Sequence, residues 1–370
     1  MTEIRRTLSL QAKIRTSIEE DGVPEDEGGH VVACAATPGK VVSVWGRQTS
    51  GEDKFKAYFS EKQIKCDNLE KLEDMPHSLG VICQRGQKQG QVNQDTFFIL
   101  QREEWLLVGV CDGHGSHGHS IADYVQTQLP NLIMNNIKAG QSFEKSSKSA
   151  FDETTKKITE DASIRELATY SGSTTSVVYL HREKDLWRLN CAFVGDSAIV
   201  LAVRPPGESV WEVAQMGDVH RPDRDDELTR FRSQGGNVVE VNGSARLECE
   251  DYTLAMSRSF GDLKARECGL ISDPEVPAEM ALQEDLQYLI ILASDGVWDV
   301  CSPIQAVQMV AKLGPREAQS SAQRLATKAK TRWKEEHNSG YTDDITVIVC
   351  WPDLNVVAEA EPEAAADAEG

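Results

Sequence analysis

Residues 105–119 read Trp-Leu-Leu-Val-Gly-Val-Cys-Asp-Gly-His-Gly-Ser-His-Gly-His. The apolar run over 105–111 is typical of a short buried strand. It ends in Asp-Gly-His-Gly at 112–115, where the glycines permit a tight turn and let the backbone approach a ligand closely. A carboxylate and an imidazole therefore stand together at a strand end, although Asp-Gly alone is also a common turn dipeptide. Further carboxylates at other strand ends would favour a functional site at this position over a simple turn.

The composition describes a chain that is long enough for a large core and strongly acidic. It has 370 residues, of which 59 are acidic and 39 basic, and a formal net charge of −20. This balance argues against general nucleic-acid binding, which needs a basic face, and suits metal binding by carboxylates. Nine cysteines are scattered without a Cys-x-x-Cys pair, which indicates neither a disulfide framework nor zinc-finger spacing. We therefore expect a reducing compartment, cytoplasmic or nuclear.

The two ends of the chain differ from its middle. No apolar run is long enough to span a bilayer, and we find no signal-peptide core. We interpret residues 1–77 as a partly ordered N-terminal extension that docks on the domain as extra strands. Within it, 4–18 suggests a basic amphipathic helix or a loose arm, apolar runs over 30–45 predict strands, and 60–75 predicts a charged helix. Residues 353–370 are rich in Ala, Glu and Asp and predict a disordered acidic tail.

The middle, residues 78–352, alternates strand and helix signals. The expected strands are 79–83, 95–100, 106–111, 174–180, 187–194, 198–203, 237–241, 252–256, 288–293 and 345–351. The expected helices are 119–139 with a kink or break at Pro130, 143–168, the part of 216–235 after Pro222, 303–312 and 315–335. We expect 85–95 to form a polar hairpin, and the three strands between 174 and 203 to form one antiparallel set.

Acidic turns recur at the ends of the apolar strands. They are Asp112-Gly113, Asp295-Gly296 and Asp343-Asp344, with Asp95 starting a fourth strand directly. Hard divalent cations such as Mg²⁺ and Mn²⁺ take oxygen ligands, and two of them about 4 Å apart can clamp a phosphoryl group. One acidic turn is more often only a turn, but several at apolar strand ends favour a shared metal site.

Two other chemistries are weaker interpretations of the same stretch. His114, His117 and His119 suggest a zinc cluster, but they lack a convincing fourth ligand, and the carboxylates favour a harder ion. Cys111 resembles a small apolar core residue more than a nucleophile, because a cysteine-phosphatase loop would need a following arginine that is absent here.

The order of short blocks resembles the metal-dependent PPM (type 2C) family of protein phosphatases over roughly residues 78–352. The blocks are Asn-Gln-Asp at 93–95, Asp-Gly-His-Gly at 112–115, Ser-Gly-Ser-Thr-Thr at 171–175, Val-Gly-Asp-Ser at 194–197, Asp-Val-His-Arg-Pro at 218–222, Ala-Met-Ser-Arg-Ser-Phe-Gly-Asp at 255–262, Ala-Ser-Asp-Gly-Val-Trp-Asp at 293–299 and Thr-Asp-Asp-Ile-Thr-Val at 342–347. The resemblance implies an α+β fold: a β-sandwich of two antiparallel sheets, flanked on each side by helices, with metal ions in the cleft between the sheets.

The resemblance also implies a binuclear Mn²⁺ or Mg²⁺ centre. Asp112 would bridge both ions and Gly113 would add its carbonyl, while Asp295 and Asp343 would complete the first ion and Asp95 would serve the second. A hydroxide bridging the two ions would attack phosphorus directly, without a phospho-enzyme.

Further roles follow by the same resemblance. His114 would be the general acid that protonates the departing seryl or threonyl oxygen. Asp196 and Asp299 match positions that support a third, looser ion.

The chain departs from the family at its second metal position. Many members have Glu-Asp where this chain has Gln94-Asp95, and we expect the neutral amide to loosen the second ion. Arg85 and Lys88 are alternative candidates for the phosphate-binding cation. Residues 204–250 would include the mobile flap beside the cleft.

The main hypothesis is a monomeric, metal-dependent serine/threonine phosphatase that acts on phosphorylated proteins. A pseudophosphatase that binds partners through the same fold is the alternative; the aspartates and His114 are all present, which favours the enzyme. A third hypothesis makes residues 1–77 a module that directs the phosphatase to a target or a membrane.

Overall fold

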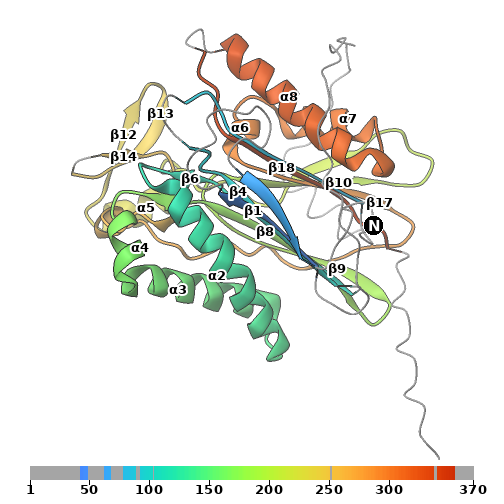
Figure 1. The fold of residues 1–370 in the computed structure, drawn as a ribbon, viewed down its shortest axis with the longest axis horizontal. Coiled ribbons are helices and arrows are strands. Elements are labelled where there is room, and N and C mark those ends of the chain that lie inside the picture. Colours follow the sequence, from blue (N-terminus) through green and yellow to red (C-terminus); the bar gives the residue numbers. More distant parts are fainter. Residues whose placement is uncertain are drawn as a thin grey trace, which may run out of the picture.

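The computed structural model describes residues 42–48, 62–67, 78–88, 92–102, 104–250, 252–336 and 340–354. This part of the chain forms four layers, with two sheets packed face to face and helices covering both outer faces (Figure 1). The expected β-sandwich of two antiparallel sheets is confirmed. The predicted helix over 4–18 and the predicted tail beyond 354 lie outside the described residues.

The larger sheet has seven strands. In spatial order they are β16 (Met280–Ala281), β9 (Leu186–Val194), β8 (Thr175–Glu183), β5 (Trp105–Cys111), β4 (Thr96–Arg102), β1 (Val42–Gln48) and β2 (Lys62–Asp67). Neighbouring strands pair antiparallel, so that the end of β5 at Cys111 lies opposite the start of β4 at Thr96. The opening stretch is therefore a central strand of this sheet.

The smaller sheet has five strands. In spatial order they are β11 (Glu212–Gln215), β10 (Ala198–Arg204), β17 (Gln287–Ala293), β18 (Ile345–Trp351) and β3 (Ser78–Gln84). Ala293 at the end of β17 pairs with Val347 near the start of β18. The acidic turns at Asp295 and Asp343, which adjoin these strand ends, therefore lie at the same end of this sheet.

Two predicted pairings are wrong. The segment 85–95 is no hairpin, because β3 belongs to the smaller sheet and β4 to the larger one. Likewise β10 leaves β8 and β9 and pairs with β17 and β11 in the other sheet. Apolar alternation predicts strands but carries no information about the partner of each strand. Both connections cross between the sheets, and each carries a candidate site residue.

Four long helices cover the outer faces. On the larger sheet lie α2 (Gly118–Lys138) and α3 (Phe143–Glu160), and on the smaller sheet lie α7 (Pro303–Ala311) and α8 (Ala318–Glu336) (Figure 1). The helix α2 runs on through Pro130 without a break. The predicted helix over 143–168 is divided at Asp161, whose side chain caps α4 (Ala162–Leu167) by accepting a hydrogen bond from Ser163 N at 3.0 Å.

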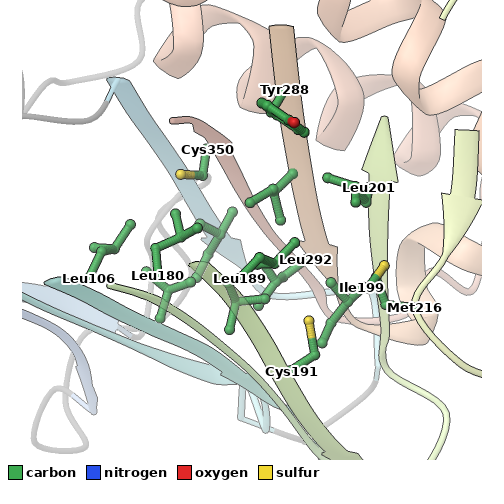
Figure 2. Packing of buried hydrophobic residues seen from close by; sticks show 14 of the residues in the cluster. Leu106, Leu180, Leu189, Cys191, Ile199, Leu201, Met216, Tyr288, Leu292 and Cys350 are labelled. Carbon is green, nitrogen blue, oxygen red and sulfur yellow. The ribbon is translucent and has the colours of Figure 1, made fainter. Parts of the chain in front are cut away.

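Three apolar layers hold the sandwich together. Along β5, Leu106, Val108 and Val110 face the core between the sheets, whereas Leu107 and Cys111 face α2. Figure 2 shows the central core, in which side chains from both sheets meet. Alternate residues of β5 therefore point to opposite faces of the sheet, and both faces are buried. Packing on both faces holds the strand that leads to Asp112.

Residues 60–75 were expected to be helical, and this prediction is wrong for the described part. Residues Lys62–Asp67 form strand β2, which pairs with β1, and β1 pairs with β4. The order Gln-Ile-Lys-Cys alternates polar and apolar residues, and a free sheet edge favours that period over a helix. The division of the chain at residues 77 and 352 stays a prediction.

Two small sheets complete the domain. One contains β6 (Gly113–His114), β7 (Gly172–Ser173) and β15 (Phe260–Gly261). The other contains β12 (Asn237–Val241), β13 (Ser244–Glu248) and β14 (Thr253–Leu254), beside helix α5 (Asp225–Ser233). Within the described ranges, no helix combines the length and the apolar character needed to cross a membrane.

Leu180 tests the central core. Its side chain is fully buried between the sheets, whereas Leu186 at the turn into β9 is 46 % exposed. Replacing Leu180 by Ala should lower the free energy of unfolding by about 2–5 kcal/mol, because a cavity forms in a close-packed layer. The matched variant Leu186→Ala should change it by less than about 0.5 kcal/mol in the same urea titration. Equal effects of the two variants would contradict this view of the core.

Candidate active site

Four of the candidate aspartates stand at strand ends, two from each sheet. Asp95 precedes β4 and Asp112 follows β5. Asp295 opens α6 (Asp295–Trp298) just after β17, and Asp343 precedes β18. The structure therefore brings together, at one end of the sandwich, four acids that lie up to 248 residues apart in sequence.

The carboxylates repel one another. Loss of hydration, followed by the charge of Asp344, raises the pKa of Asp95 to about 7. Loss of hydration and then the charges of Asp95, Asp295 and Asp343 hold the pKa of Asp112 well above its ordinary value. The pKa of Asp295 is raised for the same reason, with Asp343 as the main repelling neighbour. The site therefore has an excess of negative charge that a cation would relieve.

Ser294 joins the two sheets at this point. Its hydroxyl donates a hydrogen bond to Asp95 Oδ2 at 2.7 Å and accepts one from Thr346 N at 3.0 Å. Asp95 N in turn donates to Asn93 Oδ1 at 3.0 Å. Sequence reasoning missed Ser294, although it directly precedes an acidic turn that was singled out.

Gly113 has no room for a side chain. A Cβ there would lie 2.4 Å from Gly118 O and 2.7 Å from Gln94 O. The Gln94 amide stands where many members of the family that the sequence resembles have a carboxylate, and its Nε2 donates to Gly115 O at 2.6 Å. A carboxylate cannot donate this bond, so the amide fixes the turn that carries Gly113. Its effect on a second ion stays a prediction.

The two candidate phosphate-binding cations differ in position. The Lys88 ammonium forms an ion pair with Asp343 and lies 3.4 Å from Asp344 Oδ2. Burial alone would lower the pKa of Lys88, but Asp344 and Asp343 raise it. Arg85 Nη2 instead donates to Lys88 O at 3.0 Å and so supports the turn. Lys88 is therefore the cation in direct contact with the acids.

Asp344 is a buried acid that the sequence analysis placed in an acidic turn without giving it a role. One of its oxygens accepts a hydrogen bond from Gly86 N at 2.7 Å and the other accepts one from Gln94 N at 3.0 Å. It therefore ties the segment between the sheets to the start of β18.

Asp196 and Asp299 lie near enough to Asp295 for their charges to raise its pKa. Asp196 is buried and its Oδ1 has no hydrogen-bond partner among the described residues. Asp299 is exposed, and its Oδ1 lies 3.2 Å from Arg221 Nη2. Loss of hydration raises the pKa of both acids, and Arg221 opposes this rise.

His114 lies beside the acids but is held by another residue. Its Nε2 lies 2.6 Å from Oδ2 of Asp262, a fully buried acid. Burial alone would lower the pKa of His114, but the Asp262 carboxylate raises it. His117 is exposed, with its Nδ1 3.0 Å from Ser116 Oγ. His114 and His117 thus have separate surroundings, which does not favour a zinc cluster.

The donor set fits a hard divalent cation in chemistry. It consists of carboxylates whose pKa values are raised, with one buried and unpartnered oxygen on Asp196. As the side chains stand, no three His, Cys, Asp or Glu residues of the described ranges form a ready-made metal-ligand group. Lys88 already supplies one positive charge at Asp343.

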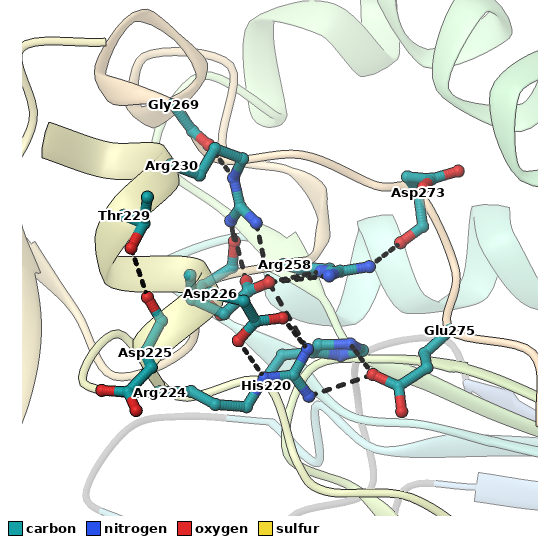
Figure 3. Close-up of polar contacts among 12 residues, drawn as sticks. His220, Arg224, Asp225, Asp226, Thr229, Arg230, Arg258, Gly269, Asp273 and Glu275 are labelled. Atoms are coloured by element: carbon teal, nitrogen blue, oxygen red, sulfur yellow. Dashed lines mark hydrogen bonds and ion pairs between the residues drawn. The ribbon is translucent and has the colours of Figure 1, made fainter. Parts of the chain in front are cut away.

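A network of charged residues fixes the segment next to the site (Figure 3). Glu227 of α5 is fully buried and accepts hydrogen bonds from Arg230 Nη1 and Arg258 Nη2, each at 2.7 Å. Behind it, His220 Nδ1 accepts a hydrogen bond from Gly195 N at 3.1 Å. The network therefore connects the segment predicted as a flap with the turn that carries Asp196.

Comparison with known proteins gives one consistent result. Residues 80–338 match the family model described as protein phosphatase 2C. The chain is 30 % identical over 305 residues to "Probable protein phosphatase 2C 72" of Arabidopsis thaliana, covering 75 % of this chain and 86 % of that protein. It is 31 % identical over 300 residues to "Probable protein phosphatase 2C 64" of Oryza sativa subsp. japonica, covering 78 % and 68 %. The fold is similar to the crystal structure of a serine-threonine phosphatase 2C from Toxoplasma gondii, with a TM-score of 0.64 and 19 % identity, covering 85 % of this chain and 99 % of that one.

Glu227 offers a test of the charged network. Burial alone would raise its pKa, but the hydrogen bonds from Arg230 and Arg258 lower it from 4.5 to about 2. Because the pKa is lower in the folded state, the stabilisation is present above pH 4.5 and is lost as the pH falls toward 2. Glu227→Gln should lower the free energy of unfolding at pH 7 by about 3 kcal/mol, and this difference should shrink below about pH 5.

The measurement is urea unfolding of wild type and variant between pH 7 and pH 3. The matched control is Glu240→Gln, because Glu240 is exposed on β12 and should change stability little at any pH. A constant difference across this pH range would contradict the proposed ion pairing of Glu227.

Proposed function

Because this chain belongs to the protein phosphatase 2C family, we propose that it hydrolyses phosphoserine and phosphothreonine on protein substrates with the help of Mn²⁺ or Mg²⁺. One observation carries the proposal: one buried and three half-buried acids from both sheets meet at one end of the sandwich and repel one another. Such a cluster is costly in a protein unless cations neutralise it. The reaction fits, because a dianionic phosphate ester also needs positive charge around it.

The residues that would hold the ions are those at the strand ends. Asp112 would contact both ions, Gly113 would offer its carbonyl, Asp295 and Asp343 would hold the first ion, and Asp95 would hold the second. Asp196 and Asp299 would serve a third ion. Two bound divalent cations would lower the pKa of water toward neutrality and neutralise the charge on the phosphoryl oxygens.

Other side chains would bind and orient the phosphoprotein. Lys88 lies among the acids and carries the positive charge that a phosphate oxygen would meet, with Arg85 supporting its backbone. His114 would give a proton to the departing seryl or threonyl oxygen, which is a poor leaving group without it. Acid catalysis by one positioned side chain is typically worth about 10²–10⁴-fold in rate.

The pseudophosphatase alternative has no observation in its favour. A dead relative would be expected to lack one of the site acids, whereas Asp95, Asp112, Asp295 and Asp343 are all present. We further propose that the working unit is residues 78–352 and that it acts as a monomer. In this proposal, residues 1–77 add strands to the edge of the larger sheet.

Metal dependence is the first test of the proposed function. The purified protein should hydrolyse a phosphothreonine peptide when Mn²⁺ or Mg²⁺ is added, and EDTA should abolish the activity. Asp295→Asn should reduce turnover beyond the roughly 10–100-fold loss seen when residues that only support a metal ligand are changed. The matched control is Asp152→Asn, an exposed position on α3, which should keep full activity. Metal-independent turnover, or none with either metal, would refute the proposal.

The acid role of His114 predicts a dependence on the leaving group. His114→Ala should slow hydrolysis of a phosphothreonine peptide by about 10²-fold or more, because its alkoxide needs a proton. It should slow p-nitrophenyl phosphate far less, because nitrophenolate leaves without one. His117→Ala is the control, since that imidazole is exposed three residues away. Equal slowing of both substrates by His114→Ala would argue against the acid role.

A further inference from the structure

Asp262 is a buried acid that the proposed reaction leaves without a role. It follows β15, is fully buried and has a positive φ of 45°, which is rare for a residue with a side chain. Its N–H donates to Ser171 O at 2.9 Å. A buried charge in a strained backbone position persists only where its surroundings hold it there.

The side chain of Asp262 is aimed at His114. Its Oδ2 lies 2.6 Å from His114 Nε2 and accepts a second hydrogen bond, from Ser259 Oγ, at 2.5 Å. Its Oδ1 is buried with no hydrogen-bond partner in the part of the chain that the structure describes. A carboxylate left with one unpaired oxygen indicates that the other oxygen has the essential contact.

The small sheet around β7 is shaped for this pair. Gly172 of β7 pairs with His114 on one side and with Gly261 on the other. A Cβ on Gly172 would lie 2.1 Å from Asp262 Oδ2 and 2.6 Å from His114 Nε2. Glycine at this position therefore lets an imidazole and a carboxylate from different strands meet across a third strand.

The contact fixes which ring nitrogen is engaged. An ionised carboxylate only accepts hydrogen bonds, so His114 Nε2 must carry a proton and donate it toward Asp262. The other ring nitrogen, Nδ1, is buried and has no hydrogen-bond partner among the described residues. Nδ1 is thus the ring nitrogen without a partner, and a substrate oxygen reaches it only after the groups that cover it move.

We propose that Asp262 is the positioning residue of His114: it holds the ring through Nε2–H, so that Nδ1 is the atom that delivers the proton to the leaving oxygen. The inference rests on the proposed function. As the P–O bond to the seryl or threonyl oxygen breaks, its electron pair stays on that oxygen and takes the Nδ1 proton. The ring keeps its Nε2 proton, which stays hydrogen-bonded to Asp262. Phosphorus takes the OH of water, and the other water proton replaces the one that Nδ1 gave away, so that the products are inorganic phosphate and the free alcohol.

The kinetic test compares Asp262→Asn with Asp273→Asn in the Mg²⁺-loaded protein. Asparagine has the shape of aspartate and tolerates a positive φ, but it loses the charge and can donate to Nε2 instead of accepting from it. Asp262→Asn should lower kcat on a phosphothreonine peptide at least 10-fold and change kcat on p-nitrophenyl phosphate less than about 3-fold. The control, Asp273→Asn, changes an exposed carboxylate and should leave both rates unchanged.

A second measurement uses the wild-type protein and does not depend on the folding of any variant. The ¹⁵N ring signals of His114, assigned by their loss in His114→Gln, should show a protonated Nε2 in the Mg²⁺-loaded protein. An unprotonated Nε2, or equal slowing of both substrates by Asp262→Asn, would overturn the positioning role. If the wild type hydrolyses neither substrate, the proposed function itself fails, which is a separate outcome.

Discussion

Repulsion among buried and half-buried carboxylates is the constraint on which the rest of this structure depends. Asp95, Asp112 and Asp295 all have raised pKa values because they share a poorly hydrated volume. Acids in free loops would move apart, but here each one is fixed at the end of a strand that is buried on both faces. Packing of the apolar layers thus holds the carboxylates close together although they repel one another. A positive charge bound among them would relieve this repulsion.

Both sheets contribute to this site. Each sheet supplies two of the four acids, and two of the connections that cross between the sheets carry Asp95 and Asp196. Hydrogen bonds from residues far away in sequence hold the connection between β3 and β4 at both of its ends. Asp344 accepts one from Gly86 N, 258 positions away, and Ser294 donates one to Asp95, 199 positions away. The charged network around Glu227 does the same for the neighbouring segment, where the apolar core is small. Polar contacts therefore complete the site where apolar packing ends.

The strands, the helices and the acidic turns could be predicted from local patterns, because burial leaves a period of two or 3.6 in the sequence. The pairing of strands could not, and so the segment 85–95 was taken for a hairpin. The strand at Lys62–Asp67 was missed because its charged surroundings are typical of an exposed helix. It is a strand because it pairs with β1 at the edge of the larger sheet, which the local sequence does not reveal. The roles of Asp262, Ser294 and Asp344 were missed because they lie in contacts with residues that are distant in sequence.

The position of β18 has a consequence for how the protein is made. This strand is the last of the smaller sheet to be synthesised, yet it lies between β17 and β3 in the sheet. The strand β3 is the first of the same sheet to be synthesised. During translation, more than 260 residues are therefore synthesised after β3 before its partner strand β18 exists. Asp343, one of the proposed metal ligands, is synthesised in the same late segment, so the proposed metal site cannot form until the domain is almost complete. Under the proposed function, activity would therefore appear only after nearly the whole domain has been synthesised.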